Sequence, residues 1–201
     1  MALVVLDLQH LGRGGRHEGD MGAAADLDGD GRTECHEREA LLALGYLTAA
    51  GLELNRRGHQ VIVLSQGEYP DRQALAVELA LEASTLRRRA VYVACHINAG
   101  KGNYGLVLHD RRAAKGAAVA AAVAEQLAGL PEIPRALTKA AVGEWGRAAP
   151  CIEGAWTHGE LLPAIVFEPC FIDQPAHAAL LSPEGLQRIG RALAEGRHKA
   201  V

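Results

Sequence analysis

The chain has few cysteines and none in a spacing that carries chemistry. Cys35, Cys95, Cys151 and Cys170 lie far apart, and no CxxC pair occurs. That spacing argues against a zinc finger built on cysteines and against a dithiol redox motif. We interpret the four as small core residues or free thiols.

An excess of charge of one sign is also missing. Lys and Arg number 21 against 24 Asp and Glu, which gives a formal net charge of -3. A nucleic-acid-binding surface normally shows as an excess of basic residues, so no nucleic-acid partner is expected.

Long hydrophobic runs are absent as well. No apolar stretch approaches the roughly 20 residues that span a bilayer, so membrane insertion is not expected. The amino terminus, MALVVLDLQH, lacks the basic start and the extended apolar core of a secretory signal. We therefore expect a protein that is made in the cytoplasm without a signal peptide. Its 201 residues, 49% of them hydrophobic, suit one domain with a substantial core, which we expect to be a monomer.

Hydrophobic runs typical of buried strands recur at residues 3–6, 61–64, 91–95, 104–108 and 164–167. Segments with helical spacing alternate with them, at residues 37–57, 71–88, 112–128 and 183–195. This alternation predicts a single α/β domain over residues 1–201, with a mostly parallel twisted central sheet flanked by helices. A glycine-rich stretch at about residues 12–36 has few apolar anchors and is expected to form a long surface loop.

Polar residues with metal-binding or acid-base chemistry follow three of the predicted strands. The stretch VYVACHINAGKGNYG ends its strand at His96, the first strand runs through Asp7-Leu8-Gln9 to His10, and PAIVFEPCFID ends its strand at Glu168. In open α/β sheets, ligands bind outside the carboxyl ends of the strands. Two histidines are suitable zinc ligands, and a carboxylate beside them is a suitable general base for an activated water. We therefore expect an active site at this edge.

A catalytic zinc site typically needs a third protein ligand. The start of the first predicted helix offers Glu34, Glu37 and Glu39. Acidic residues are also common in a first helical turn because they complement the helix dipole, so the cluster alone does not identify a ligand.

The same segment matches a calcium-binding loop. In DLDGDGRTECHE, acids stand at positions 1, 3 and 5, glycine at 6 and glutamate at 12. In that register, calcium would be held by Asp26, Asp28, Asp30, the carbonyl of Arg32 and a bidentate Glu37, with Glu34 at position 9. The alternative is a polar Asp-Gly turn that binds no ion.

Together these stretches resemble the type 3 family of zinc-dependent N-acetylmuramoyl-L-alanine amidases. The matching segments are VVLDLQHLGRGG, EALLALGYLTAAGLELNRRGHQVIVLS, VYVACHINAG and PAIVFEPCFID. The resemblance implies that His10 and His96 bind zinc with a glutamate from the helix start, and that Glu168 is the catalytic base. The implied activity is hydrolysis of the amide between N-acetylmuramic acid and L-alanine in peptidoglycan, the expected substrate.

Spacing within the family pattern favours Glu39 as the third zinc ligand, with Glu37 as the alternative. On a continuous helix the two residues lie roughly 200° apart, so one could face a loop-bound cation while the other faces the sheet edge. The chain departs from the pattern in the turn before His10, which lacks Pro-Gly, in Ser65-Gln66 for Thr-Arg, and at Cys170 for glycine and Asp173 for asparagine. No departure removes an expected ligand or the base.

Several functions stay open at this point. A zinc peptidase would apply the same chemistry to another amide, and a calcium-loop module without catalysis would leave the histidines and Glu168 unused. We see no separate cell-wall-binding domain, so a phage endolysin that acts on the cell wall after release is favoured over a bacterial cell-wall remodelling amidase. The roles of Asn98, Tyr104 and Trp156 are unassigned.

Overall fold

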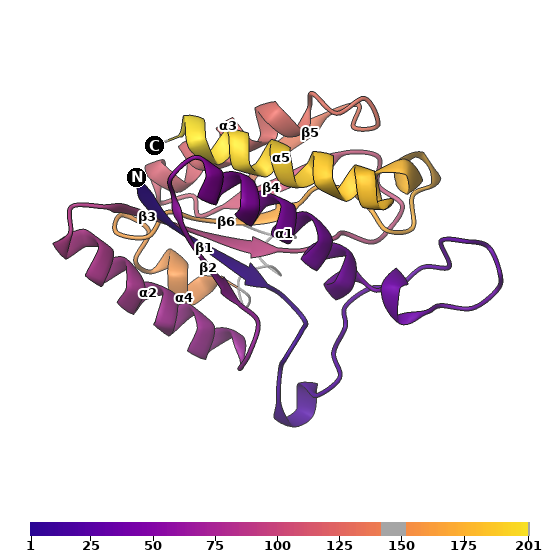
Figure 1. Cartoon of the computed structure of the whole chain (residues 1–201), viewed down its shortest axis with the longest axis horizontal. Helices are drawn as coiled ribbons and strands as arrows, with labels where there is room; N and C mark the ends of the chain where they lie inside the picture. Colours follow the sequence, from indigo (N-terminus) through magenta and orange to yellow (C-terminus); the bar gives the residue numbers. More distant parts are fainter. Residues whose placement is uncertain (142–151, 201) are drawn as a thin grey trace.

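The computed structural model describes residues 1–141 and 152–200, and it is an α/β domain with one central sheet (Figure 1). The strands lie in the order β2-β1-β3-β6-β4-β5. Their bounds are Ala2–Leu8 for β1, Gln60–Leu64 for β2, Arg89–Cys95 for β3, Gly105–His109 for β4, Ala136–Ala140 for β5 and Ala164–Glu168 for β6. The predicted fold class is therefore confirmed.

Strand direction divides the sheet into two parts. Strands β2, β1, β3 and β6 run parallel to one another, whereas β4 is antiparallel to β6 and parallel to β5. The carboxyl ends of β1, β3 and β6 consequently meet at one edge of the sheet.

Helices cover both faces of the sheet (Figure 1). Their bounds are Glu39–Arg56 for α1, Tyr69–Thr85 for α2, Ala114–Leu127 for α3, Glu153–Trp156 for α4 and Pro183–Lys199 for α5. Residues of α1, α3 and α5 share one buried cluster with Val4, Leu6 and Leu8 of β1, and residues of α2 and α4 share a second with Leu3 and Val5. The alternation follows from the period of two along a strand that is buried on both faces.

The structure corrects the sequence analysis at several boundaries. Strand β1 continues to Leu8, so Asp7 is a strand residue and not part of a polar turn. Helix α1 begins at Glu39, because residues Cys35–Glu37 form a separate 3-10 turn. Strand β5 and helix α4 were not predicted: ALTKA has no run of apolar residues, and α4 is one short turn. No helix among the described residues is long and apolar enough to cross a membrane.

A buried ion pair anchors the turn that follows β1. Asp7 and Arg72 have exposed fractions of 0% and 1%, and Nη1 of Arg72 donates to Oδ1 of Asp7 at 3.0 Å. The same guanidinium donates to three backbone carbonyls, at 2.7 Å to Leu8, at 2.8 Å to Gly67, and to Leu11. Burial raises the pKa of Asp7, although hydrogen bonds from Tyr92 and Arg72 oppose that shift. One arginine of α2 therefore holds the chain on both sides of residue 10.

Replacing Arg72 by methionine is expected to destabilise the fold by about 3–5 kcal/mol, because a buried carboxylate and several backbone carbonyls lose the donor that they share. Urea unfolding followed by circular dichroism measures this loss. The matched control is Arg188→Met, which removes a partly exposed pair with Glu132 and should cost less than about 1 kcal/mol. Equal losses in the two variants would contradict the anchoring role of Arg72.

Candidate metal and catalytic site

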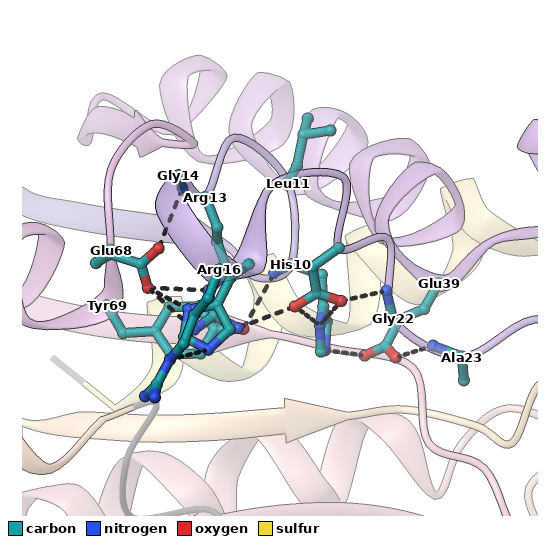
Figure 2. Close-up of polar contacts among 12 residues, drawn as sticks. His10, Leu11, Arg13, Gly14, Arg16, Gly22, Ala23, Glu39, Glu68 and Tyr69 are labelled. Atoms are coloured by element: carbon teal, nitrogen blue, oxygen red, sulfur yellow. Dashed lines mark hydrogen bonds and ion pairs between the residues drawn. The ribbon is translucent and has the colours of Figure 1, made fainter.

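His10 lies two residues beyond the end of β1 in a left-handed backbone conformation, with a φ of 66°. Its backbone N–H donates to the hydroxyl of Tyr69 at 3.2 Å. The turn continues through Gly12, where a Cβ atom would lie 1.9 Å from the carbonyl oxygen of Ser65, so only glycine fits there. The imidazole points toward Glu39, with 3.4 Å between Nε2 and Oε1 (Figure 2).

His96 follows β3 at the same edge. Its backbone N–H donates to the carbonyl of Phe167 at 3.0 Å, and its own carbonyl accepts from the hydroxyl of Tyr46 at 2.9 Å. Its Nδ1 lies 2.9 Å from Oε1 of Glu39. The ring centroids of His10 and His96 are 5.2 Å apart, and the two ring planes are nearly perpendicular.

Glu39 is the first residue of α1 and the carboxylate that both imidazoles share. Its Oε1 also accepts from the backbone of Ile97 at 3.1 Å, and its Oε2 accepts from Ala23 at 2.9 Å. Burial alone would raise the pKa of Glu39, but the hydrogen bonds and charges of the two histidines outweigh it and lower the pKa. The carboxylate is therefore held as an anion at a buried position.

The donor set of this group suits a zinc ion. Ligand atoms of His10, Glu39 and His96 all lie within 4.8 Å of one another, as two imidazole nitrogens and one carboxylate oxygen. Three protein ligands of this kind leave one coordination position for water or substrate, which is the arrangement of catalytic zinc sites.

Glu37, the alternative third ligand, lies in a different environment. Its Oε1 accepts from the backbone of Leu27 at 2.5 Å, and its Oε2 accepts from the backbone of Glu34 at 2.9 Å. Among the described residues, the group that contains both histidines includes Glu39 and not Glu37.

The predicted calcium loop brings its acids close together. Ligand atoms of Asp26, Asp28 and Glu37 form one group within 4.8 Å, and those of Asp28, Asp30 and Glu34 form another. Most of these carboxylates accept hydrogen bonds from the loop's own backbone, for example Asp26 from Gly29 at 2.7 Å and from Gly31 at 2.9 Å. Calcium binding, with the carbonyl of Arg32 as a further ligand, stays a prediction.

Glu168 stands next to His96 across two paired strands. The register that pairs Cys95 with Phe167 places the following residues side by side. Burial raises the pKa of Glu168, the positive charge of His96 lowers it, and the negative charge of Glu39 raises it. Among the described residues, Glu168 is not part of the three-residue group. A carboxylate with raised proton affinity beside that group is suited to proton transfer.

Asn98 is a site residue whose role the sequence left unassigned. Its Nδ2 donates to Oε2 of Glu168, and its backbone N–H and C=O bond to Cys170 and Ile172. It therefore orients the carboxylate of Glu168. The signal in the sequence is the HINA motif, since Asn98 lies two residues beyond His96, where the chain forms a bridge with Phe171 just after β6.

Trp156 and Tyr104, whose roles the sequence also left unassigned, make packing and backbone contacts. Trp156 is buried and donates through Nε1 to the carbonyl of Ala164 at 3.1 Å, and Tyr104 packs edge-on against Phe171. Cys95 and Cys170 are buried free thiols and Cys35 is an exposed one, whereas Cys151 lies outside the described residues.

Sequence comparisons found no matching family model and no matching curated protein. Solved structures with the same fold were found. Cwp6 from Clostridium difficile matches over 100% of this chain with a TM-score of 0.73 and 19% identity, but this chain spans only 29% of that one. The N-acetylmuramoyl-L-alanine amidase AmiC2 of Nostoc punctiforme matches 98% of this chain and 96% of its own, with a TM-score of 0.68 and 20% identity.

The catalytic domain of the CD27L endolysin targeting Clostridia Difficile covers 99% of this chain and 98% of its own, with a TM-score of 0.62 and 14% identity. At these identities the likeness concerns the backbone, whereas function has to be argued from the site. The chain therefore has the α/β fold that is seen in N-acetylmuramoyl-L-alanine amidases.

Zinc retention separates the two candidate glutamates. Glu39→Gln is expected to lose most of its zinc, because it removes the carboxylate between the histidines, whereas Glu37→Gln should keep near-stoichiometric zinc. Metal analysis by mass spectrometry after dialysis of both purified variants measures the difference. The opposite pattern would assign the ligand to Glu37.

Calcium binding by the loop can be tested separately. Calcium is expected to raise the melting temperature of the wild-type protein relative to EGTA, because an ion that binds only the folded state stabilises it. Asp28→Asn, at a residue that both acidic groups share, should lose most of this shift. Asp71→Asn, at a residue outside the loop, is the control. If calcium raises the melting temperature of Asp28→Asn as much as that of Asp71→Asn, the loop is not the site.

Proposed function

We propose that this chain is a zinc-dependent N-acetylmuramoyl-L-alanine amidase that cleaves the bond between N-acetylmuramic acid and L-alanine in peptidoglycan. The observation that carries the proposal is the grouping of His10, Glu39 and His96 within 4.8 Å, with Glu168 beside them. This grouping lies in a fold that AmiC2, itself an N-acetylmuramoyl-L-alanine amidase, shares.

The three grouped residues would hold the metal, and His10, Glu39 and His96 are the ligands that we propose. Zinc in such a site supplies a Lewis acid for the substrate carbonyl and lowers the pKa of water to about 7. Glu39 contributes one negative charge, which offsets part of the charge of a divalent cation.

Glu168 is proposed as the general base and then as the general acid. Asn98 donates to Oε2, which leaves Oε1 as the oxygen placed to take a proton from the attacking water. The same oxygen would pass that proton to the L-alanine nitrogen as the amide C–N bond breaks. A raised pKa favours this second step, because the carboxyl group then holds the proton long enough to deliver it.

The setting that we propose is lytic, with the enzyme acting as a phage endolysin. It is supported by the fold shared with the catalytic domain of the CD27L endolysin. The alternative, a bacterial cell-wall remodelling amidase, uses the same chemistry, and AmiC2 supports it equally at the level of fold. A zinc peptidase is the second alternative, and parallel assays on muropeptides and on peptides without a sugar distinguish it.

Glu168→Gln is expected to keep near-stoichiometric zinc and to lose about 100- to 10,000-fold in rate, the usual contribution of a general base. Glutamine preserves size, so the change is confined to proton transfer. The measurement is release of new L-alanine amino groups from purified peptidoglycan, together with zinc content.

The matched control is Glu160→Gln at an exposed carboxylate, paired with Lys115, which should keep the wild-type rate. Loss of zinc from Glu168→Gln would make Glu168 a ligand. A wild-type rate in that variant would overturn the mechanism at its central step.

A further inference from the structure

Asp20 lies behind His10, on the side away from Glu39. Its Oδ1 and Oδ2 are 3.1 Å and 3.0 Å from Nδ1 of His10. Oδ1 also accepts from the backbone N–H of Gly22 at 3.0 Å, and Oδ2 accepts from Nη1 of Arg13 at 2.9 Å. Each of these three groups is therefore able to donate a hydrogen bond to the carboxylate.

These contacts select one form of the His10 ring. An ionised carboxylate only accepts hydrogen bonds, so the proton of a neutral imidazole is favoured on Nδ1. The lone pair then lies on Nε2, the atom 3.4 Å from Oε1 of Glu39. Nε2 is thus presented to the proposed metal position with its lone pair free to coordinate.

Arg13 holds Asp20 in place from the other side. Its Nη2 and Nε donate to Oε2 of Glu68 at 3.0 Å and 3.3 Å, and its guanidinium carbon lies 4.1 Å from the centre of the Tyr69 ring (Figure 2). Glu68 also accepts from the backbone N–H of Gly14 at 3.1 Å. These contacts fasten the segment that carries Asp20 to the start of α2, whose Tyr69 hydroxyl also binds the backbone of His10.

We propose that Asp20 is a positioning residue that fixes the Nδ1–H tautomer and the ring orientation of His10 for metal binding, and that Arg13 positions Asp20. The proposal rests on the metal site of the proposed function. Carboxylate partners of this kind orient a metal-bound histidine and raise its basicity, and their loss typically weakens metal affinity about 10- to 100-fold.

A purely structural salt bridge is the competing explanation, and it predicts a different result. His10 and Asp20 keep 22% and 27% of their side-chain surface exposed, so the pair should add little to folding stability. A structural role would lower the melting temperature of the metal-free protein, whereas a positioning role would lower zinc affinity and leave that temperature unchanged.

The experiment measures the zinc dissociation constant of the metal-free protein by competition with a chromophoric chelator, and the melting temperature of the same samples. Asp20→Ala is expected to bind zinc about 10- to 100-fold more weakly, with the melting temperature of the metal-free protein unchanged. Asp20→Asn should be weakened similarly, because its amide NH2 faces a donor in either orientation. Glu160→Gln is the control, since it removes an exposed ion pair with Lys115 and none of the contacts of His10, Asp20 or Arg13, and its affinity should stay close to wild type.

Wild-type affinity in both Asp20 variants would overturn the inference. So would a loss of affinity accompanied by a matching loss of stability in the metal-free protein. An absence of zinc binding in the wild-type chain itself would instead overturn the proposed function. The two failures are therefore distinguishable in one set of measurements.

Discussion

The buried contact between Arg72 and Asp7 is the constraint on which the site depends. A guanidinium has several donors in a fixed plane. Here they donate hydrogen bonds to one carboxylate and to the carbonyls of Leu8, Leu11 and Gly67. Because two of those carbonyls lie on either side of residue 10, the contact dictates the path of the turn. His10 can then keep its left-handed backbone conformation, which would relax to a less strained one if the turn were unsupported.

The second constraint is Glu39, where three parts of the chain meet. The carboxylate belongs to α1, accepts from the loop at Ala23 and from Ile97 just beyond β3, and contacts both histidines. Gly22 is required beside it, because a Cβ there would lie 2.4 Å from Oε2. A buried anion between two imidazoles is most stable with compensating positive charge, which protonated rings or a divalent cation would supply.

The residues at strand ends could be predicted from sequence, and those in the loop could not. His10, His96 and Glu168 each follow an apolar run, and parallel strands bring such residues to one edge, so pattern and topology alone suffice. The choice between Glu37 and Glu39 as the residue that contacts both histidines depended on where α1 begins. The 3-10 turn at Cys35–Glu37 decides this through hydrogen bonds to the loop. Asp7 and Gln9 were expected in a polar turn, but burial with Arg72 and Tyr92 makes them interior residues. Asp20 has no periodicity around it, and only the folded path of the loop reveals its contact with His10.

Strand direction explains why so much of the site comes from a loop. Strands β4 and β5 run opposite to the rest, so the carboxyl end of β4, at His109 and Asp110, lies at the far edge from His96. Of the described strands, β1, β3 and β6 lead into residues of the candidate site, and they provide two imidazoles and one carboxylate that stands outside the three-residue group. The third member of the His10–Glu39–His96 group therefore comes from the start of α1, and the carboxylate that contacts Nδ1 of His10 comes from the segment before it. This requires the long segment between β1 and α1 to be held in place, and its ties to α2 through Arg13 and Glu68, and to the sheet edge through Glu39, meet that requirement.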